Sequence, residues 1–150
     1  MPEVASRTAE PFVRSEAPID QRIVVVDDSP TILYAICCLL EHHKVGRVIG
    51  SAPGGAEAIE RVRQLQPDLL LMDADMPEMS GLRTALVISQ LFPQTKIVLM
   101  SMDSSEYFRK GARACGAGSV IYKPKFLSAV AGVLAEAPEN GQKREKCLEI

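Results

Sequence analysis

Acidic, hydroxyl and amine side chains follow directly after four of the apolar stretches in this sequence. They are Asp27 and Asp28, Asp73, Ser101 and Lys123. If the stretches are parallel strands, these residues meet in the crevice beyond the strands' carboxyl ends, where open α/β sheets bind ligands. Carboxylates crowded together raise one another's pKa unless a cation is present. Mg²⁺ suits such a place because it binds a few carboxylate and carbonyl oxygens and keeps several waters.

A divalent metal beside an amine predicts phosphoryl chemistry. Both charges would neutralise the oxygens of a phosphoryl group, so most of the catalysis would be positioning and charge stabilisation. We expect Asp73 to lie deepest along the sheet, which makes it the candidate nucleophile for an aspartyl phosphate. Structural alternatives remain for three of these residues. Asp73 could end a strand or cap a helix, Ser101 could be a helix N-cap, and Lys123 could be a solvated strand end.

The elements that must position these residues alternate between strand and helix. Apolar runs predict strands at 23–26, 47–51, 69–72, 96–100 and 119–122. Apolar residues at helical spacing predict helices at 31–43, 54–66, 82–92, 103–114 and 127–137. Strands that alternate with helices of this length imply right-handed crossovers. We therefore predict an α/β fold with a doubly wound, five-stranded parallel sheet flanked by five helices.

Length and composition narrow the class of protein further. A chain of 150 residues with 47% hydrophobic and 24% charged residues is typical of one globular domain. The 17 basic and 19 acidic residues give a net charge of −2, so no electrostatic signature of nucleic-acid or anionic-membrane binding is present. No apolar run approaches a membrane span and the N-terminus lacks a secretory pattern, which favours a cytoplasmic protein. The four cysteines have no metal-ligand or C-x-x-C spacing.

Four spaced motifs follow one another along the chain. They are Val26-Asp27-Asp28-Ser29, then Asp73-x-x-Met76-Pro77-x-x-x-Gly81, then Ser101 at the end of the fourth strand, and finally Gly116-Ala117 leading to Lys123-Pro124. In this order they resemble the receiver domain of the two-component response-regulator family, which has a flavodoxin-like fold. The resemblance spans residues 22–136. Each motif alone is weak, whereas the four in sequence are highly specific.

The resemblance implies a role for each acidic residue of the site. Asp73 would be the phosphoacceptor and also a metal ligand, and Asp28 would bind Mg²⁺ directly. Asp27 would act mostly through metal-bound water, and Asp75 would give its backbone carbonyl to the metal. The implied cofactor is therefore Mg²⁺.

The resemblance also covers the hydroxyl and the amine. Ser101 and Lys123 would hold the phosphoryl oxygens, and Lys123 would pair with the phosphoacceptor beforehand; the bond after this lysine is often cis in the family. Two positions depart from the family pattern. The residue after Ser101 is usually small but is Met102 here, which we expect to narrow access to the phosphoacceptor. Val120 replaces the usual aromatic switch residue, and Tyr122 on the same strand face either substitutes for it or simply packs on the last helix.

These observations lead to an expected function. We expect a stand-alone receiver at 21–137, with a flexible tail at 1–20 and a short tail at 138–150. It would accept a phosphoryl group from a sensor histidine kinase or a histidine phosphotransfer protein. It would then signal to a separate effector protein through the surface around the fourth helix, the fifth strand and the last helix. We expect no membrane insertion, no direct nucleic-acid binding, and no enzyme activity beyond its own aspartyl phosphorylation and dephosphorylation.

Two other functions compete with this one. A receiver-fold interaction module that is never phosphorylated is compatible with Met102 and Val120. An enzyme is the other, because Asp73-x-Asp75 resembles the nucleophile motif of haloacid-dehalogenase-type phosphatases, although that motif belongs after the first strand and needs a larger cap or core. Turnover of a small phosphate ester would favour the enzyme. A dinucleotide site is excluded, since no Gly-x-Gly-x-x-Gly follows the first strand.

Overall fold

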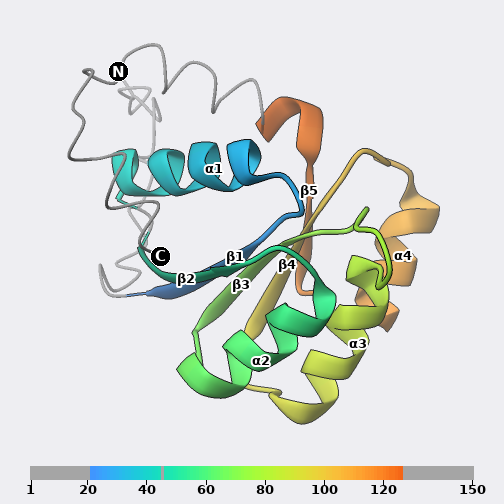
Figure 1. The fold of residues 1–150 in the computed structure, drawn as a ribbon. Coiled ribbons are helices and arrows are strands. Elements are labelled where there is room, and N and C mark those ends of the chain that lie inside the picture. Colours follow the sequence, from blue (N-terminus) through green and yellow to red (C-terminus); the bar gives the residue numbers. More distant parts are fainter. Residues whose placement is uncertain (1–20, 45, 127–150) are drawn as a thin grey trace, which may run out of the picture.

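A five-stranded parallel sheet forms the centre of the molecule (Figure 1). The computed structural model describes residues 21–44 and 46–126. The strands are β1 (Arg22–Val26), β2 (Arg47–Ala52), β3 (Leu69–Asp73), β4 (Lys96–Ser101) and β5 (Ser119–Tyr122), paired in the order β2-β1-β3-β4-β5. The predicted sheet is therefore confirmed. The order reverses between β1 and β3, so their carboxyl ends form the switch point at which open sheets bind ligands.

Helices cover both faces of the sheet. Those that the structure describes are α1 (Pro30–His42), α2 (Gly55–Leu65), α3 (Gly81–Leu91) and α4 (Glu106–Ala114). α1 packs on one face, and α2, α3 and α4 pack on the other (Figure 1). None of these helices is long and apolar enough to cross a membrane. Residues 123–126 are also helical, whereas the predicted fifth helix at 127–137 and the predicted tails lie outside the described residues.

Alternate side chains of the strands enter two separate cores. In β1, Val24 and Val26 join the core under α2 and α3, while Ile23 and Val25 join the core under α1. All four side chains are fully buried. Burial on both faces explains why the strands are continuous apolar runs. The register of β1 with β2 shifts by one residue between Ile23 and Val24. The polar residues that end the strands are consequently held along one edge of the sheet.

Among the described helices α1 to α4, three begin at a serine side chain. The N-caps of α1, α3 and α4 are Ser29, Ser80 and Ser105, and each hydroxyl accepts the N–H three residues further on. The start of α4 differs from the prediction, because the helix begins at Glu106 and not at residue 103. The Asp103 carboxylate accepts the N–H of Ser105, which holds this short segment in a turn before the helix.

Candidate functional site

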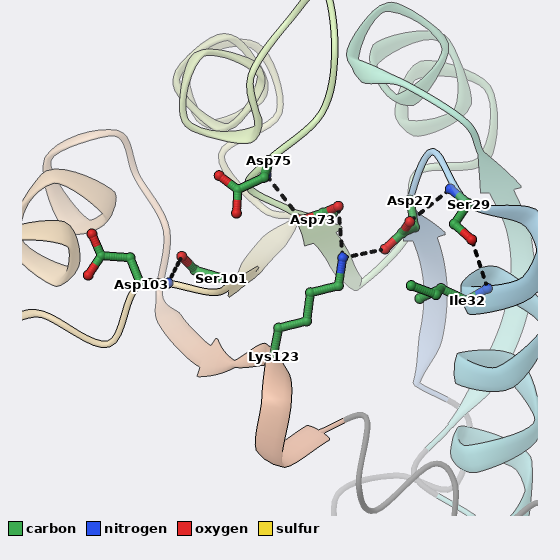
Figure 2. Close-up of polar contacts among 8 residues, drawn as sticks. All are labelled: Asp27, Ser29, Ile32, Asp73, Asp75, Ser101, Asp103 and Lys123. Atoms are coloured by element: carbon green, nitrogen blue, oxygen red, sulfur yellow. Dashed lines mark hydrogen bonds and ion pairs between the residues drawn. The ribbon is translucent and has the colours of Figure 1, made fainter.

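An ammonium group joins two buried carboxylates at the carboxyl edge of the sheet (Figure 2). The Lys123 Nζ lies 3.1 Å from Asp27 Oδ2 and 2.9 Å from Asp73 Oδ2. Asp27 follows β1, Asp73 ends β3, and Lys123 follows β5. The three residues are 0%, 2% and 8% exposed, respectively. Lys123 is thus a buried counterion to both acids and not a solvated strand end.

Backbone N–H groups hold the second oxygen of each carboxylate. The Ser29 N–H donates to Asp27 Oδ1 at 2.9 Å, and the Asp75 N–H donates to Asp73 Oδ1 at 3.0 Å. Each acid therefore has one oxygen on its own loop and the other on Lys123. This arrangement fixes the orientation of both carboxylates. The Asp75 side chain itself is exposed and lies apart from Lys123 (Figure 2).

Burial and neighbouring groups shift the pKa values of Asp27 and Lys123. Burial raises the pKa of Asp27, and the neighbouring Asp73 adds to this, although the Ser29 N–H and Lys123 oppose it. Burial by itself would lower the pKa of Lys123, but hydrogen bonds to Asp73 and Asp27 outweigh it and the pKa is raised. Lys123 is therefore fully charged at neutral pH.

The acids also form a group with the spacing of metal ligands. Carboxylate oxygens of Asp27, Asp28 and Asp73 lie within 4.8 Å of one another, and Asp28 is exposed whereas the other two are buried. Three carboxylates and one ammonium leave a formal charge of −2. An all-oxygen donor set of this charge, open to water on one side, fits a hard divalent cation such as Mg²⁺.

The hydroxyl predicted for the site lies at the same edge but in a separate group of contacts. Ser101 ends β4 next to β3 and is buried. Its Oγ accepts the N–H of Asp103 at 2.9 Å (Figure 2). Among the described residues, no hydrogen bond joins Ser101 to the acids or to Lys123. It is not the α4 N-cap, because Ser105 occupies that position.

The response regulator receiver domain family matches residues 23–131 of this chain. The chain belongs to that family. Solved receivers have the same fold: the signal receiver domain of NarL from Mycobacterium tuberculosis is 25% identical with a TM-score of 0.65, and the match covers 79% of this chain and 98% of that one. For the response regulator domain of Thermotoga maritima CheB, the identity is 23%, the TM-score 0.64, and the coverage 79% and 99%. The predicted receiver fold and phosphoacceptor function are thereby confirmed.

Curated relatives place such a receiver within a longer protein. The protein-glutamate methylesterase/protein-glutamine glutaminase of Alkalilimnicola ehrlichii is 32% identical over 127 residues, which are 85% of this chain and 32% of the relative. A second enzyme of this name, from Methanospirillum hungatei, is 37% identical over 105 residues, or 69% of this chain and 30% of the relative. The chain therefore spans about a third of the length of these relatives.

These relatives contradict one prediction. We expected no enzyme activity beyond the receiver's own phosphorylation and dephosphorylation, whereas the relatives are named as enzymes. The prediction was wrong because it used only the residues at the strand ends. Those residues carry no information about an activity located elsewhere in a longer protein. The stand-alone organisation of this receiver stays a prediction.

The two departures from the receiver pattern have different surroundings. Met102 is 58% exposed, in the segment between β4 and α4. Val120 of β5 is partly buried and packs against the core under α2 and α3. Tyr122 is also partly buried and is paired in register with Ser101. The Lys123–Pro124 bond is trans, which is not the form that the resemblance gives as frequent.

Two residues near the receiver site have roles that the motifs alone did not explain. A Cβ at Gly81 would lie 2.4 Å from the Asp73 carbonyl oxygen and 2.6 Å from Ala74 Cα, so only glycine lets α3 begin this close to the acid. Asp103 was predicted only as the start of a helix, but it contacts Ser101. The alternation Ser101-x-Asp103-x-Ser105 is the signal that was available, because such side chains bind nearby backbone N–H groups.

Proposed function

We propose that Asp73 accepts a phosphoryl group from the phosphohistidine of a sensor histidine kinase or a histidine phosphotransfer protein. A carboxylate oxygen of Asp73 attacks phosphorus, the P–N bond breaks, and its electron pair leaves with the imidazole. The observation that carries this proposal is the position of Lys123, whose Nζ already contacts Asp73 Oδ2. The same ammonium group would contact the phosphoryl oxygens as they arrive.

The remaining residues of the site have supporting roles in this proposal. The Asp75 N–H orients the Asp73 carboxylate. The Ser101 Oγ accepts a backbone N–H, which leaves its own proton free to be donated to a phosphoryl oxygen. Asp27, Asp28 and Asp73, together with the Asp75 carbonyl, would hold the metal ion. Bound Mg²⁺ supplies positive charge to the phosphoryl oxygens in such a transfer.

The proposed receiver occupies residues 21–137 and acts in the cytoplasm by changing its contacts with an effector. These contacts would change with the phosphorylation of Asp73, because phosphorylation adds negative charge and acceptor oxygens beside Lys123. The curated relatives are enzymes about three times as long as their matched segments. They favour an enzyme module as the effector, either linked to the receiver or separate from it.

Intact-mass measurement of the full chain tests this proposal. With Mg²⁺ and acetyl phosphate we expect one phosphoryl adduct per chain, and none without Mg²⁺ or in Asp73→Asn. The matched control is Asp68→Asn, the same change just before β3 at its opposite end. There the carboxylate accepts the Arg22 N–H, and an asparagine oxygen can do the same. An adduct that survives in Asp73→Asn would contradict the proposal, as would a folded wild type that forms no adduct.

A further inference from the structure

A series of hydrogen bonds runs from Ser101 to the first turn of α4. The Ser101 Oγ accepts the N–H of Asp103 at 2.9 Å, and Asp103 Oδ1 accepts the N–H of Ser105 at 2.8 Å. The Ser105 Oγ in turn accepts the N–H of Phe108 at 3.1 Å. Each side-chain oxygen thus holds the backbone two or three residues ahead of it. We call these four residues the β4–α4 ladder.

Hydrogen bonds and not packing hold the segment that the ladder crosses. Ser101 is buried at the end of β4, but the next four residues, 102–105, are all exposed. Among the described residues, no ion pair involves this segment. Segments with few buried contacts and exposed hydrogen bonds open at low free energy. The conformation of residues 102–105 therefore depends on the ladder.

The far end of the ladder is joined to the core. Phe108 is partly buried and packs against the core under α2 and α3. Val120, which stands at the usual position of the aromatic switch, packs against the same core, but its side chain has no polar atom. Phe108 of α4 therefore provides an aromatic side chain that links this region to the core. The backbone N–H of Phe108 is also the last donor of the ladder.

We propose that Asp103 is a positioning residue that couples the Ser101 hydroxyl to the start of α4. The inference rests on the proposed function, in which the Ser101 hydroxyl donates its proton to a phosphoryl group on Asp73. Because the Ser101 Oγ also holds the Asp103 N–H, any movement of the hydroxyl toward that group shifts the Asp103 backbone or breaks that bond. The Asp103 carboxylate moves with its backbone, so the bond to Ser105 and the N-cap of α4 change as well.

The charge state of Asp103 agrees with this role. Hydrogen bonds from the Ser105 hydroxyl and N–H hold the pKa of this carboxyl below its usual range. At neutral pH the side chain is therefore an ionised acceptor. A carboxylate accepts a backbone N–H more strongly than a neutral oxygen does, so this is the strongest bond of the ladder.

The first test needs no phosphorylation and measures amide hydrogen exchange, residue by residue, in the full chain. Ser101→Ala removes the first acceptor. We expect exchange to become about threefold to tenfold faster at Asp103, and also faster at Ser105 and Phe108, because losing a hydrogen bond of ordinary strength has an effect of this size. Faster exchange at Asp103 alone would overturn the inference. The control is Ser104→Ala, an exposed hydroxyl of the same segment that lies outside the ladder, and it should leave all three amides unchanged.

The second test compares the chain with and without Mg²⁺ and beryllofluoride, a mimic of the phosphoryl group. In the wild type we expect the exchange rates of Ser105 and Phe108 to change on addition. Asp103→Ala should lose this response while acetyl phosphate still gives the adduct, and Asp103→Asn should retain it, since an asparagine oxygen can accept the same N–H. A wild-type response in Asp103→Ala would overturn the inference. A wild type without adduct would refute the proposed function instead, and the Ser101→Ala result would then decide the inference.

Discussion

The two halves of the receiver site are held by different kinds of contact (Figure 2). In the acid half, Lys123 is bonded to residues 96 and 50 positions earlier in the chain, and all three partners are buried. In the β4–α4 ladder, every bond spans two or three residues and most of the segment is exposed. The acid half exists only in the folded sheet, whereas the ladder can open while the sheet stays intact.

This difference suits the acid half to phosphoryl transfer and the β4–α4 ladder to signalling. Phosphoryl transfer requires groups that are already oriented, and the acid half provides them through charged bonds in a buried place. A switch requires two arrangements of similar free energy, which exposed local hydrogen bonds of modest net strength can provide. The reacting groups of the acid half and the β4–α4 ladder therefore differ in stability, although both begin at neighbouring strand ends.

The largest effect is expected when the ammonium group is removed from the acid half. Lys123→Met leaves two buried carboxylates without their counterion, and breaking a buried ion pair in this way costs about 3 kcal/mol of the free energy of unfolding. Urea unfolding at neutral pH without Mg²⁺ measures it. Ser105→Ala, the comparison from the ladder, should cost about 1 kcal/mol as the loss of a helix N-cap. Equal losses in the two variants would remove the contrast between the halves.

The Asp27→Asn variant tests whether this loss of stability comes from the lysine or from the acid. Burial raises the pKa of Asp27 above its ordinary value of 3.8. A carboxyl with a raised pKa stabilises the fold most below its unfolded pKa, and this contribution falls as the pH rises through the folded pKa. Neutralising Asp27 should therefore cost less at neutral pH than removing Lys123. A larger loss would show that the acid, and not the lysine, is the group on which the cluster depends.

A matched pair of glycines tests the backbone beside Asp73 and within α4. Gly81→Ala would bring a Cβ to 2.4 Å from the Asp73 carbonyl oxygen, so we expect a loss of about 1–3 kcal/mol in the free energy of unfolding. Gly111 lies within α4 and a Cβ there meets nothing within 4 Å. Gly111→Ala should stabilise the chain by about 0.5–1 kcal/mol, because alanine is the better helix former. Urea midpoints measure both, and a harmless Gly81→Ala would contradict the close approach.

The smallest effect on stability is expected at Met102. Because this side chain is 58% exposed, Met102→Ala should change the free energy of unfolding by less than about 0.5 kcal/mol. If the side chain narrows access to Asp73, the variant should nevertheless accept a phosphoryl group from acetyl phosphate and lose it faster than the wild type. Adduct mass followed over time measures both rates. Unchanged rates would exclude this role for Met102.

Sequence patterns predicted the strands well and one helix start poorly. β5 was predicted at its observed bounds, and the other four strands within one residue at each end, because long apolar runs reflect burial on both faces. α4 was predicted three residues too long at its start. Polar residues there gave no apolar period, and the Asp103 carboxylate takes a backbone N–H that a helix would otherwise use.

The sequence by itself determined which residues stand at the strand ends and in which order. The chemistry of Asp73 and Lys123 was therefore predictable from motifs and from the rule that parallel strands share one carboxyl edge. Only the tertiary structure decided that one ammonium group bridges Asp27 and Asp73, and that Gly81 lies against Asp73. The physical reason is that these contacts depend on side-chain directions and close approaches between segments, which follow from packing of the whole sheet and not from local sequence.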